Sequence, residues 1–167
     1  TSYYRCNVTC SGSGITSPSS AVTITVTPAP AGATLSNPIF AGVLDCNPYS
    51  NTLSNAPGAC IGNDLAAGTN QASEDIFYFF NLSNANNFNA IVNMSHCGTG
   101  FDTYMHLLTS AGGLIVENDD AGPLCGGTAS SIQATLAPGF YYLVSEGFAA
   151  NSGNINTQIQ IAPITGA

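Results

Sequence analysis

The chain contains the residue types used in nucleophilic catalysis, but no spacing that organises them. Two histidines, His96 and His106, occur together with many serines and nine acidic residues. The Gly-x-Ser-x-Gly pattern of a nucleophile elbow is missing, and the serine of residues 144–147 lies inside an expected strand. His106 alternates with Tyr104 and Leu108 along another expected strand, which favours a core or wall position. The sequence therefore predicts that the protein is not an enzyme.

A calcium site is the stronger chemical candidate. Hard cations bind several carboxylate and carbonyl oxygens, and acidic residues gather at a few places in this sequence. The candidate ligands are Asp64, Glu74, Asp75, Asp119 and Asp120. The competing interpretations are a turn in which Asp119 and Asp120 bond their own backbone, and a strand-opening position for Asp75. Calcium is thus the one candidate cofactor, although no EF-hand or nonapeptide repeat accompanies it.

Cysteine usage indicates an oxidising compartment. The six cysteines are Cys6, Cys10, Cys46, Cys60, Cys97 and Cys125. Their even number and the lack of a Cys-x-x-Cys pair favour disulfides over a zinc or thioredoxin-like site. We expect a local disulfide between Cys46 and Cys60, and a second one between Cys97 and Cys125. In the chain-entropy model each bridge stabilises the fold by about 3 kcal/mol.

The charge balance excludes two classes of partner. Arg5 is the single basic residue, the formal net charge is −8, and charged residues make up 6% of the chain. Nothing is available to neutralise phosphates, so we expect neither nucleic-acid binding nor attraction to anionic lipids. No apolar run approaches the ~20 residues that span a bilayer, so no membrane insertion is expected. No signal peptide is present, which makes Thr1 the start of a mature product or of a piece of a longer precursor.

The N-terminal part is expected to form a β-hairpin. Residues 3–8 and 21–27 are rich in β-branched and aromatic types, and residues 10–18 between them have the composition of a loop. An isolated hairpin is marginally stable in water, so this one requires a partner. The residues expected to make that contact are Tyr3, Tyr4, Val8, Val22, Ile24 and Val26.

Cys6 and Cys10 fit this hairpin poorly. Four residues of extended strand separate their Cα atoms by ~13 Å, whereas a disulfide spans at most roughly 7 Å. Either the strand breaks between them, or at least one of the two cysteines has a partner elsewhere.

The rest of the chain has the pattern of an all-β domain. Strand candidates with turn signals between them occupy residues 39–44, 75–82, 89–94, 103–109, 114–117, 131–136, 140–146 and 155–161. No window shows a sustained helical period with caps. Eight short strands at this spacing predict a jelly-roll-like β-sandwich that carries the N-terminal hairpin as an extension.

Alternating aromatic residues predict that one sheet face is core and leave the other face open to interpretation. The alternating sets are Phe77 and Phe79 against Ile76, Tyr78 and Phe80, and Tyr141 against Phe140 and Tyr142. The second face is either a platform for a sugar or a contact surface for a protein. Because the chain lacks Trp, the usual sugar-stacking residue, core or protein packing is favoured.

Three N-glycosylation patterns begin at Asn7, Asn81 and Asn93, a number expected by chance in an Asn-rich chain. O-glycosylation of Thr and Ser would explain how a chain with so few charges stays in solution. The sequence thus raises, as a hypothesis, that the protein is a glycoprotein.

Several segments occur in an order that resembles the bacterial pre-peptidase C-terminal domain family. They are Glu-Asp-Ile-Phe-Tyr-Phe-Phe at 74–80, Phe-Asp-Thr-Tyr-Met-His-Leu-Leu at 101–108, Asn-Asp-Asp at 118–120, and Leu-Ala-Pro-Gly-Phe-Tyr-Tyr-Leu-Val-Ser-Glu-Gly at 136–147. The resemblance covers about residues 36–162. It implies a jelly-roll-like β-sandwich that is an accessory module of secreted enzymes and large surface proteins. Some relatives in secreted collagenases bind calcium and substrate.

Two further resemblances concern the cysteines and the hairpin. Residues 95–98 and 123–125 are similar to the cysteine-bearing variety in giant surface proteins of Bacteroidetes-type bacteria. Residues 3–14 and 20–26 resemble the last two strands of an immunoglobulin-like repeat whose other strands would come before. The expected organisation is an immunoglobulin-like hairpin at 1–27, a linker at 28–35 and a pre-peptidase C-terminal-like sandwich at 36–167.

Two functions follow as expectations. The preferred one is a structural or adhesive module at a bacterial cell surface or in the extracellular matrix, joined by strand addition through the hairpin and able to form a filament. Its partners would be neighbouring copies or domains of the same parent protein, or an extracellular polysaccharide or protein. The alternative is an accessory module that anchors a secreted peptidase or other hydrolase to its substrate.

Overall fold

In the computed structural model, residues 2–4, 7–9, 12, 16–18, 20–24, 26–44, 47–83 and 88–162 are described. They form thirteen strands and no helix. The strands are β1 (Ser2–Tyr4), β2 (Asn7–Thr9), β3 (Thr16–Pro18), β4 (Val22–Ile24), β5 (Ile39–Val43), β6 (Tyr49–Ser54), β7 (Ile76–Leu82), β8 (Ala90–Ser95), β9 (Thr103–Thr109), β10 (Leu114–Asn118), β11 (Ser131–Leu136), β12 (Gly139–Gly147) and β13 (Asn154–Ile161). The expectation of an all-β chain is confirmed.

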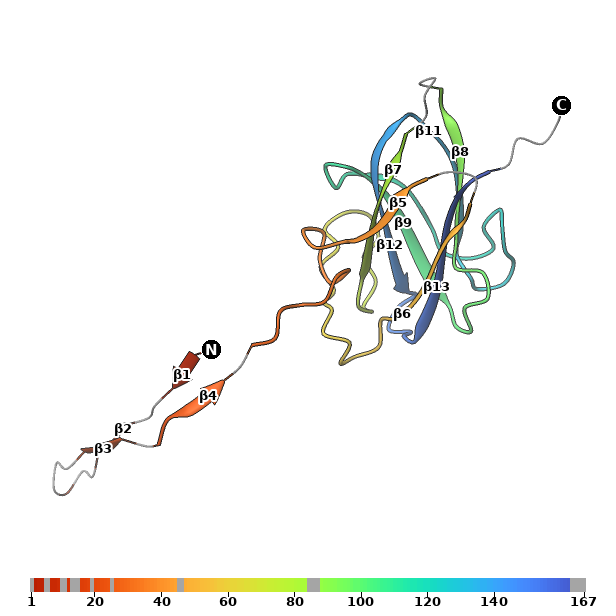
Figure 1. The fold of residues 1–167 in the computed structure, drawn as a ribbon. Helices are drawn as coiled ribbons and strands as arrows, with labels where there is room; N and C mark the ends of the chain where they lie inside the picture. Colours follow the sequence, from red (N-terminus) through yellow and green to blue (C-terminus); the bar gives the residue numbers. More distant parts are fainter. Residues whose placement is uncertain are drawn as a thin grey trace.

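Strands β5 to β13 form a sandwich of two sheets (Figure 1). The five-stranded sheet has the order β10-β9-β12-β7-β5, and the four-stranded sheet has the order β11-β8-β13-β6. All pairings are antiparallel except that of β5 with β7. Apart from β9 and β10, consecutive strands lie in different sheets, so almost every connection passes from one sheet to the other.

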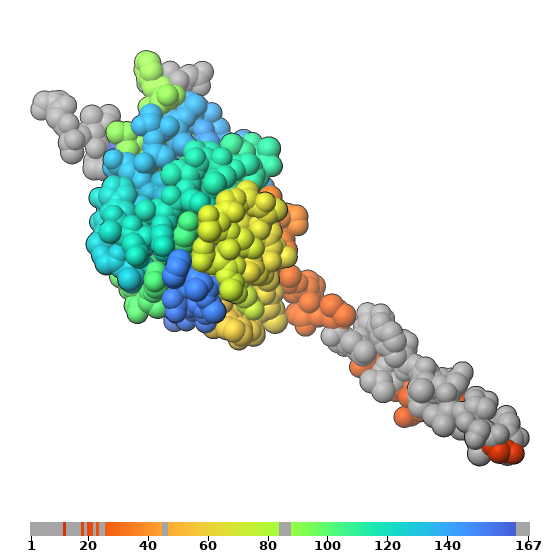
Figure 2. Space-filling view, turned by 180° about the vertical axis from the view of Figure 1, so that it is seen from behind, coloured from red at the N-terminus to blue at the C-terminus, as the bar shows by residue number. Residues whose placement is uncertain are grey.

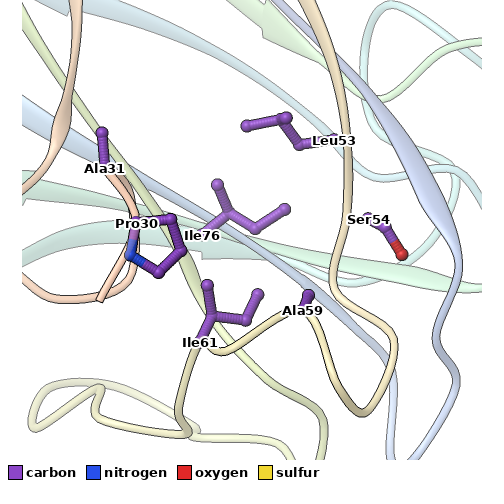
Figure 3. Close-up of a pocket in the computed structure, with 7 residues that line it drawn as sticks. All are labelled: Pro30, Ala31, Leu53, Ser54, Ala59, Ile61 and Ile76. Atoms are coloured by element: carbon purple, nitrogen blue, oxygen red, sulfur yellow. The ribbon is translucent and has the colours of Figure 1, made fainter. Parts of the chain in front are cut away.

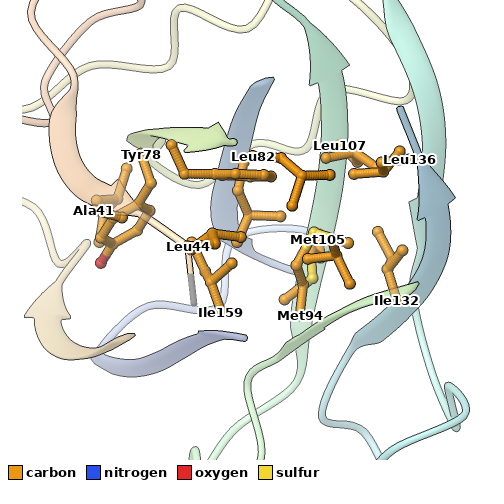
Figure 4. Close-up of a cluster of buried hydrophobic side chains, with 14 of the residues drawn as sticks. Ala41, Leu44, Tyr78, Leu82, Met94, Met105, Leu107, Ile132, Leu136 and Ile159 are labelled. Atoms are coloured by element: carbon orange, nitrogen blue, oxygen red, sulfur yellow. The ribbon is translucent and has the colours of Figure 1, made fainter. Parts of the chain in front are cut away.

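The hydrophobic core lies between the sheets and follows the two-residue period of the strands. On β7, Tyr78, Phe80 and Leu82 point inwards and are fully buried. They meet side chains of the four-stranded sheet such as Met94 and Ile159 (Figure 4). Because both sheets contribute apolar side chains at alternate positions, each sheet covers the inner face of the other.

The eight predicted strands are present, and two regions of the prediction are wrong. The bounds of β9 and β11 agree with the sequence pattern, whereas β6 was not among the expected strands and β3 lies within the expected loop 10–18. Strand β6 reads Tyr-Ser-Asn-Thr-Leu-Ser, so Tyr49 and Leu53 are its two large apolar residues. Pairing with β13 decides its conformation, because Asn and Ser have low intrinsic strand preference.

Strands β1 to β4 form two short two-stranded ladders that are separate from the sandwich. We call them together the N-terminal ribbon. β1 pairs with β4 (Tyr3 opposite Thr23), and β2 pairs with β3 (Val8 opposite Ser17), both antiparallel. The ribbon lies away from the two sheets in Figure 1 and has no strand in common with them. This agrees with the expected hairpin. Cys6 and Cys10 lie outside the described residues.

One of the two expected local disulfides is present. Cys97 is bonded to Cys125, with the Cα atoms 5.6 Å apart, and this bond ties the end of β8 to the connection before β11. Cys60 is exposed, and its sulfur is bonded to no cysteine within the described part of the chain. Its expected partner Cys46 lies outside the described residues, so that disulfide stays a prediction.

Replacing one core isoleucine should destabilise the sandwich strongly. Ile159 on β13 is fully buried in the core, so Ile159→Ala leaves a cavity and should lower the free energy of unfolding by ~2–5 kcal/mol. Urea denaturation measures the change. Ile91→Ala on the neighbouring strand β8 is the matched control, because its side chain is 46% exposed and the loss should stay below about 1 kcal/mol. Equal losses would contradict the assigned faces of the four-stranded sheet.

Candidate functional site

The outer face of the five-stranded sheet carries aromatic and titratable side chains, and we describe it as the candidate site. On its central strand β12, alternation directs Phe140, Tyr142, Val144 and Glu146 to this face, while Leu143 and Ser145 face the core. The outer face therefore has two parts. Aromatic rings occupy the end where β12 begins, and a buried acidic cluster occupies the end where it finishes.

A loop of residues 62–75, the covering loop, lies over the acidic end of this face. Its base is closed by the backbone N–H of Asp75, which donates to the carbonyl of Gly62 at 2.9 Å. Leu65 at its start packs on Phe77, Leu108 and Val144 to form a small second core. Figure 2 shows this part of the chain, in yellow, at the surface beside the strands drawn in green to turquoise.

Three carboxylates hold the covering loop by its backbone N–H groups. Asp75 accepts hydrogen bonds from the N–H of Asp64 (2.6 Å) and of Leu65 (2.8 Å). Glu117 of β10 accepts from the N–H and the hydroxyl of Thr69, both at 2.8 Å. Glu146 accepts from the N–H of Gln71 at 3.2 Å. The loop has little apolar surface of its own, so these charge-assisted bonds fix its position.

His106 of β9 joins two of these carboxylates. Its Nε2 is bonded to the Oε1 of Glu146, and its Nδ1 lies 3.2 Å from the Oε2 of Glu117. The imidazole is fully buried, and burial lowers the pKa of His106 against the opposing charges of Glu117 and Asp75. Near neutral pH the lowered pKa leaves the ring neutral, and a neutral ring donates to one of the two carboxylates.

Asp75 and Glu146 are both fully buried and lie side by side. Burial raises the pKa of Asp75 to about 7, and the charge of Glu146 adds to this effect. Burial also raises the pKa of Glu146 to about 7. Two buried carboxylates in contact cannot both stay charged without cost, so the pair holds a proton near neutral pH.

Gly68 lets the loop approach this cluster. Its φ of +79° is in the left-handed region, and a Cβ there would lie 2.5 Å from the Oε2 of Glu117 and 3.0 Å from the Nδ1 of His106. Any other residue would push the loop away from the two side chains it covers.

A second buried polar group lies on the core side of β12 and has the composition of a catalytic dyad. The Nε2 of His96 lies 2.8 Å from the hydroxyl of Ser145, which is in turn 3.0 Å from the hydroxyl of Thr157. All three side chains are fully buried, and burial lowers the pKa of His96 to about 3. The Nδ1 of His96 has no hydrogen-bond partner among the described residues. A pKa this low makes His96 a weak base, and the burial of both side chains closes the pair to substrate, so its geometry is poorly suited to activating a nucleophile.

The aromatic end of the outer face is open to solvent. We define the aromatic patch as Phe40, Phe79, Phe140 and Tyr142, with Val43 at its border. The Phe79 ring lies 5.3 Å from Phe140 in a stacked arrangement, 4.7 Å from Tyr142 and 6.3 Å from Phe40. Phe40 is 60% exposed and Phe140 is 48% exposed. The alternation predicted from the sequence is confirmed, since Tyr78, Phe80 and Tyr141 pack in the core on the other face.

The structure brings together two of the five predicted calcium ligands and adds one that the prediction missed. Carboxylate oxygens of Asp102, Asp119 and Asp120 lie within 4.8 Å of one another. The Oδ1 atoms of Asp102 and Asp119 are buried and have no hydrogen-bond partner among the described residues. Burial and the charge of Asp120 raise the pKa of both groups. Three crowded carboxylates supply part of the six to eight oxygens that calcium prefers, and the cation would relieve their repulsion.

The remaining predicted ligands lie elsewhere. Asp75 directly precedes β7, as the strand-opening interpretation expects, and it is also a buried anchor of the covering loop. Asp64 is an exposed residue of that loop, and Glu74 lies beside Asp75 in sequence. None of the three belongs to the group around Asp119. Glu146 was missed as a site residue, although an acid inside a nine-residue strand of a chain with few charges is a usable signal of a buried role.

A small cleft lies where residues 28–31 meet the sandwich. It has a volume of about 250 Å³ and is lined by Pro30, Ala31, Leu53, Ser54, Ala59, Ile61 and Ile76 (Figure 3). Its lining contains no titratable side chain, so it offers room for an apolar group and no acid–base chemistry.

Two of the three N-glycosylation patterns begin on strands of the sandwich. Asn81 and Asn93 lie within strands β7 and β8, and the side-chain oxygen of Asn93 accepts a hydrogen bond from Gln133 at 2.9 Å. Glycosylation therefore stays a hypothesis. Among the described residues there is no helix long and apolar enough to cross a membrane.

Comparison with known proteins gives a likeness among solved structures. No family model matches the chain, and a search of curated proteins finds no relative. Among solved structures, the chain is similar to the pre-peptidase C-terminal domain of a collagenase from Bacillus anthracis. The identity is 12% and the TM-score is 0.47, over 83% of this chain and 100% of that chain.

The buried acidic cluster should make stability fall as the pH rises past neutrality. The folded-state pKa of Asp75 and of Glu146 is raised to about 7, so the native state binds protons more tightly than the unfolded chain between about pH 4 and 7. The pKa values of His96 and His106 are lowered in the folded state, so these two groups make stability rise with pH. Their effect is confined to pH values below about 6.5, the ordinary pKa of histidine. Between pH 6.5 and 8 the carboxyl effect is unopposed, and urea denaturation should show falling stability.

The variant Asp75→Asn tests this assignment. Its amide oxygen still accepts from the two loop N–H groups, and its N–H₂ supplies Glu146 with a permanent donor. We expect a flatter profile between pH 6.5 and 8 and greater stability than the parent chain at pH 8. The control Asp64→Asn changes an exposed acid of the same loop and should keep the parent profile. A parent-like slope in Asp75→Asn would exclude the pair as its cause.

Calcium should stabilise the chain through the group around Asp119. At ~5 mM calcium, a site with the affinity of extracellular modules should raise the thermal midpoint by about 3–6 °C. Differential scanning calorimetry measures the rise. Asp119→Asn should remove it, whereas Asp64→Asn should leave it intact. A midpoint that calcium does not move would show that the three carboxylates hold no such site.

Proposed function

We propose that the chain is a non-catalytic structural or adhesive module of an extracellular assembly, joined to a neighbouring copy or domain through its N-terminal ribbon. The observation that carries this proposal is the pairing of the ribbon. Strands β1 to β4 pair with one another and with no strand of the sandwich within the described part of the chain.

A two-stranded ribbon of this kind needs a further partner. Its four strands are three residues long each, and a lone two-stranded ladder is marginally stable in water. Both of its edges carry backbone groups that can pair with another chain. Val26 at its end is 78% exposed, which leaves an apolar side chain without cover from the sandwich. Strand addition to a neighbour supplies backbone partners and cover together.

The geometry of such a contact favours an open polymer. The ribbon of one copy would bind a different surface on the next copy, which is a heterologous contact. Heterologous contacts that do not close into a ring build filaments. A filament of this type requires no cofactor and no catalytic residue.

The chemistry of the chain suits a location outside the cell. The disulfide between Cys97 and Cys125 persists in oxidising compartments. A net charge of −8 with a single basic residue disfavours nucleic-acid partners. We place the module at a bacterial cell surface or in its matrix, on the sequence resemblance to surface-protein modules.

A second function is supported by the aromatic patch. Exposed rings on a rigid sheet face are a common way to hold a polymer or a protein. The patch would let the module anchor a secreted peptidase or other hydrolase to its substrate, with an extracellular polysaccharide or protein as the partner.

Breaking the ribbon should abolish assembly. Thr23 pairs with Tyr3 in the centre of β4, and Thr23→Pro removes a backbone N–H and fixes φ at that position. We expect monomers in sedimentation velocity and no filaments in negative-stain microscopy. The matched control is Ala29→Pro, which lies beyond the ribbon between two prolines in an exposed segment, and it should assemble like the parent chain.

Deleting residues 1–27 gives an independent form of the same test. Both hydrophobic clusters consist of residues from Leu35 onwards, so the sandwich keeps its whole core. Residues 28–31 are retained because Pro30 and Ala31 line the cleft. The truncated chain should be a folded monomer. Polymers formed by this chain or by Thr23→Pro would refute the proposed role of the ribbon.

A further inference from the structure

The aromatic patch and the N-terminal ribbon are complementary in exposure, charge and residue pattern. The patch presents four rings on strands β5, β7 and β12, and Phe40, Phe140 and Val43 are 60%, 48% and 57% exposed. Phe79 is held in the centre by contacts with the other three rings. A rigid cluster of large apolar side chains surrounded by polar surface is typical of the energetic centre of a protein contact.

Charge is divided sharply along the chain. All nine acidic residues lie between positions 45 and 146, and residues 1–44 carry a single charge, that of Arg5. The strand segments that build the patch, residues 39–43, 77–82 and 139–144, contain no acidic or basic residue. Because each copy has a net charge of −8, two copies repel one another over most of their surfaces. The uncharged patch and the weakly positive ribbon can meet without this repulsion.

The ribbon also matches the patch in its side-chain pattern. Residues 22–27 read Val-Thr-Ile-Thr-Val-Thr, a strict alternation of aliphatic and hydroxylated residue types. Two sheet faces pack through their apolar side chains at a spacing of about 10 Å, and aliphatic side chains fit between aromatic rings. Arg5 adds the one cation of the chain, which is attracted to the faces of aromatic rings.

We infer that the aromatic patch is the acceptor surface for the N-terminal ribbon of a second copy of this chain. This inference rests on the proposed function and specifies it, because it names the surface to which the ribbon binds. The donor is residues 1–27 of one copy, and the acceptor is the outer face of β5, β7 and β12 of the next. Because β5 is an edge strand of its sheet, its free backbone groups allow strand addition beside the contact with the rings. Every copy carries one donor and one acceptor at different places, so the contact repeats head to tail.

A second exposed apolar surface, on β10, is less suited to this role. Leu114, Ile115 and Val116 of β10 are 40%, 40% and 37% exposed, but they belong to one edge strand and include no ring. The ladder of β10 with β9 shifts its register between Leu114 and Val116, and such a bulge protects an edge against strand addition. These residues therefore serve as a matched control for the patch.

Complementation between two defective chains tests the inference. The chain lacking residues 1–27 keeps the acceptor and has no donor. The full-length variant Phe40→Ser with Phe140→Ser keeps the donor and has a damaged acceptor. Each alone should be monomeric in sedimentation velocity, and their mixture should give a one-to-one dimer that does not grow. The two Phe substitutions should weaken the contact by more than about thirtyfold, the scale of interface hot spots.

The control is Ile115→Ser with Val116→Ser, which removes two exposed apolar side chains outside the patch and should assemble like the parent chain. Thermal unfolding midpoints that match the parent show that each variant is folded.

Three results would overturn the inference. Polymers formed by the Phe40→Ser, Phe140→Ser chain would show that the acceptor lies elsewhere, while the proposed function would stand. Loss of assembly only in the Ile115→Ser, Val116→Ser chain would move the acceptor to β10. Parent-like assembly of the Phe variant together with lost adsorption to cellulose or chitin particles would assign the patch to a polysaccharide. If the chain lacking residues 1–27 still polymerises, the proposed function itself fails.

Discussion

The burial of β12 on both faces constrains most of this molecule. The strand lies between β7 and β9, and its last five residues, 143–147, are all buried. Its inner side chains are covered by the four-stranded sheet, as in any sandwich. Its outer side chains include the carboxyl group of Glu146, which requires hydrogen-bond donors once it is removed from water. The covering loop provides both the apolar cover, through Leu65, and the donors, through its backbone N–H groups.

This arrangement divides the outer face of the sheet into two chemically distinct halves. Where the loop lies on the sheet, acids and a histidine are enclosed and hold the loop in place. Beyond the edge of the loop, aromatic rings reach solvent. The same two strands, β7 and β12, run through both halves of the face. A rigid platform and a fixed cover are thus built on one pair of strands, so the position of the rings depends on the packing beneath the loop.

Much of the fold follows from local pattern, and the sites do not. The two-residue alternation of β9 and β11 is clear enough to give their bounds, because their side chains differ strongly in polarity between faces. Strand β6 has two large apolar residues and owes its conformation to β13, a partner more than one hundred residues away in sequence. The acidic cluster is beyond pattern analysis for a similar reason. Alternation tells which face Glu146 occupies, but not that Gln71, 75 residues earlier, returns over that face. Asp102 was likewise missed, because its proximity to Asp119 arises from how the connections at one end of the sandwich pack.

The alternation of consecutive strands between the two sheets has a consequence for how quickly the chain folds. Among the described strands of the sandwich, β9 and β10 are the one pair of sequence neighbours that also pair in space. Every other ladder joins distant segments, as in the pairing of Ile76 with Ser145. Loop closure must therefore precede most of the stabilising contacts, and topologies of this kind fold in milliseconds to seconds. During that interval the apolar strands of the nascent chain are exposed to other copies, whose strands carry the same open edges. Contacts between nascent copies would therefore compete with folding for the same unpaired backbone groups.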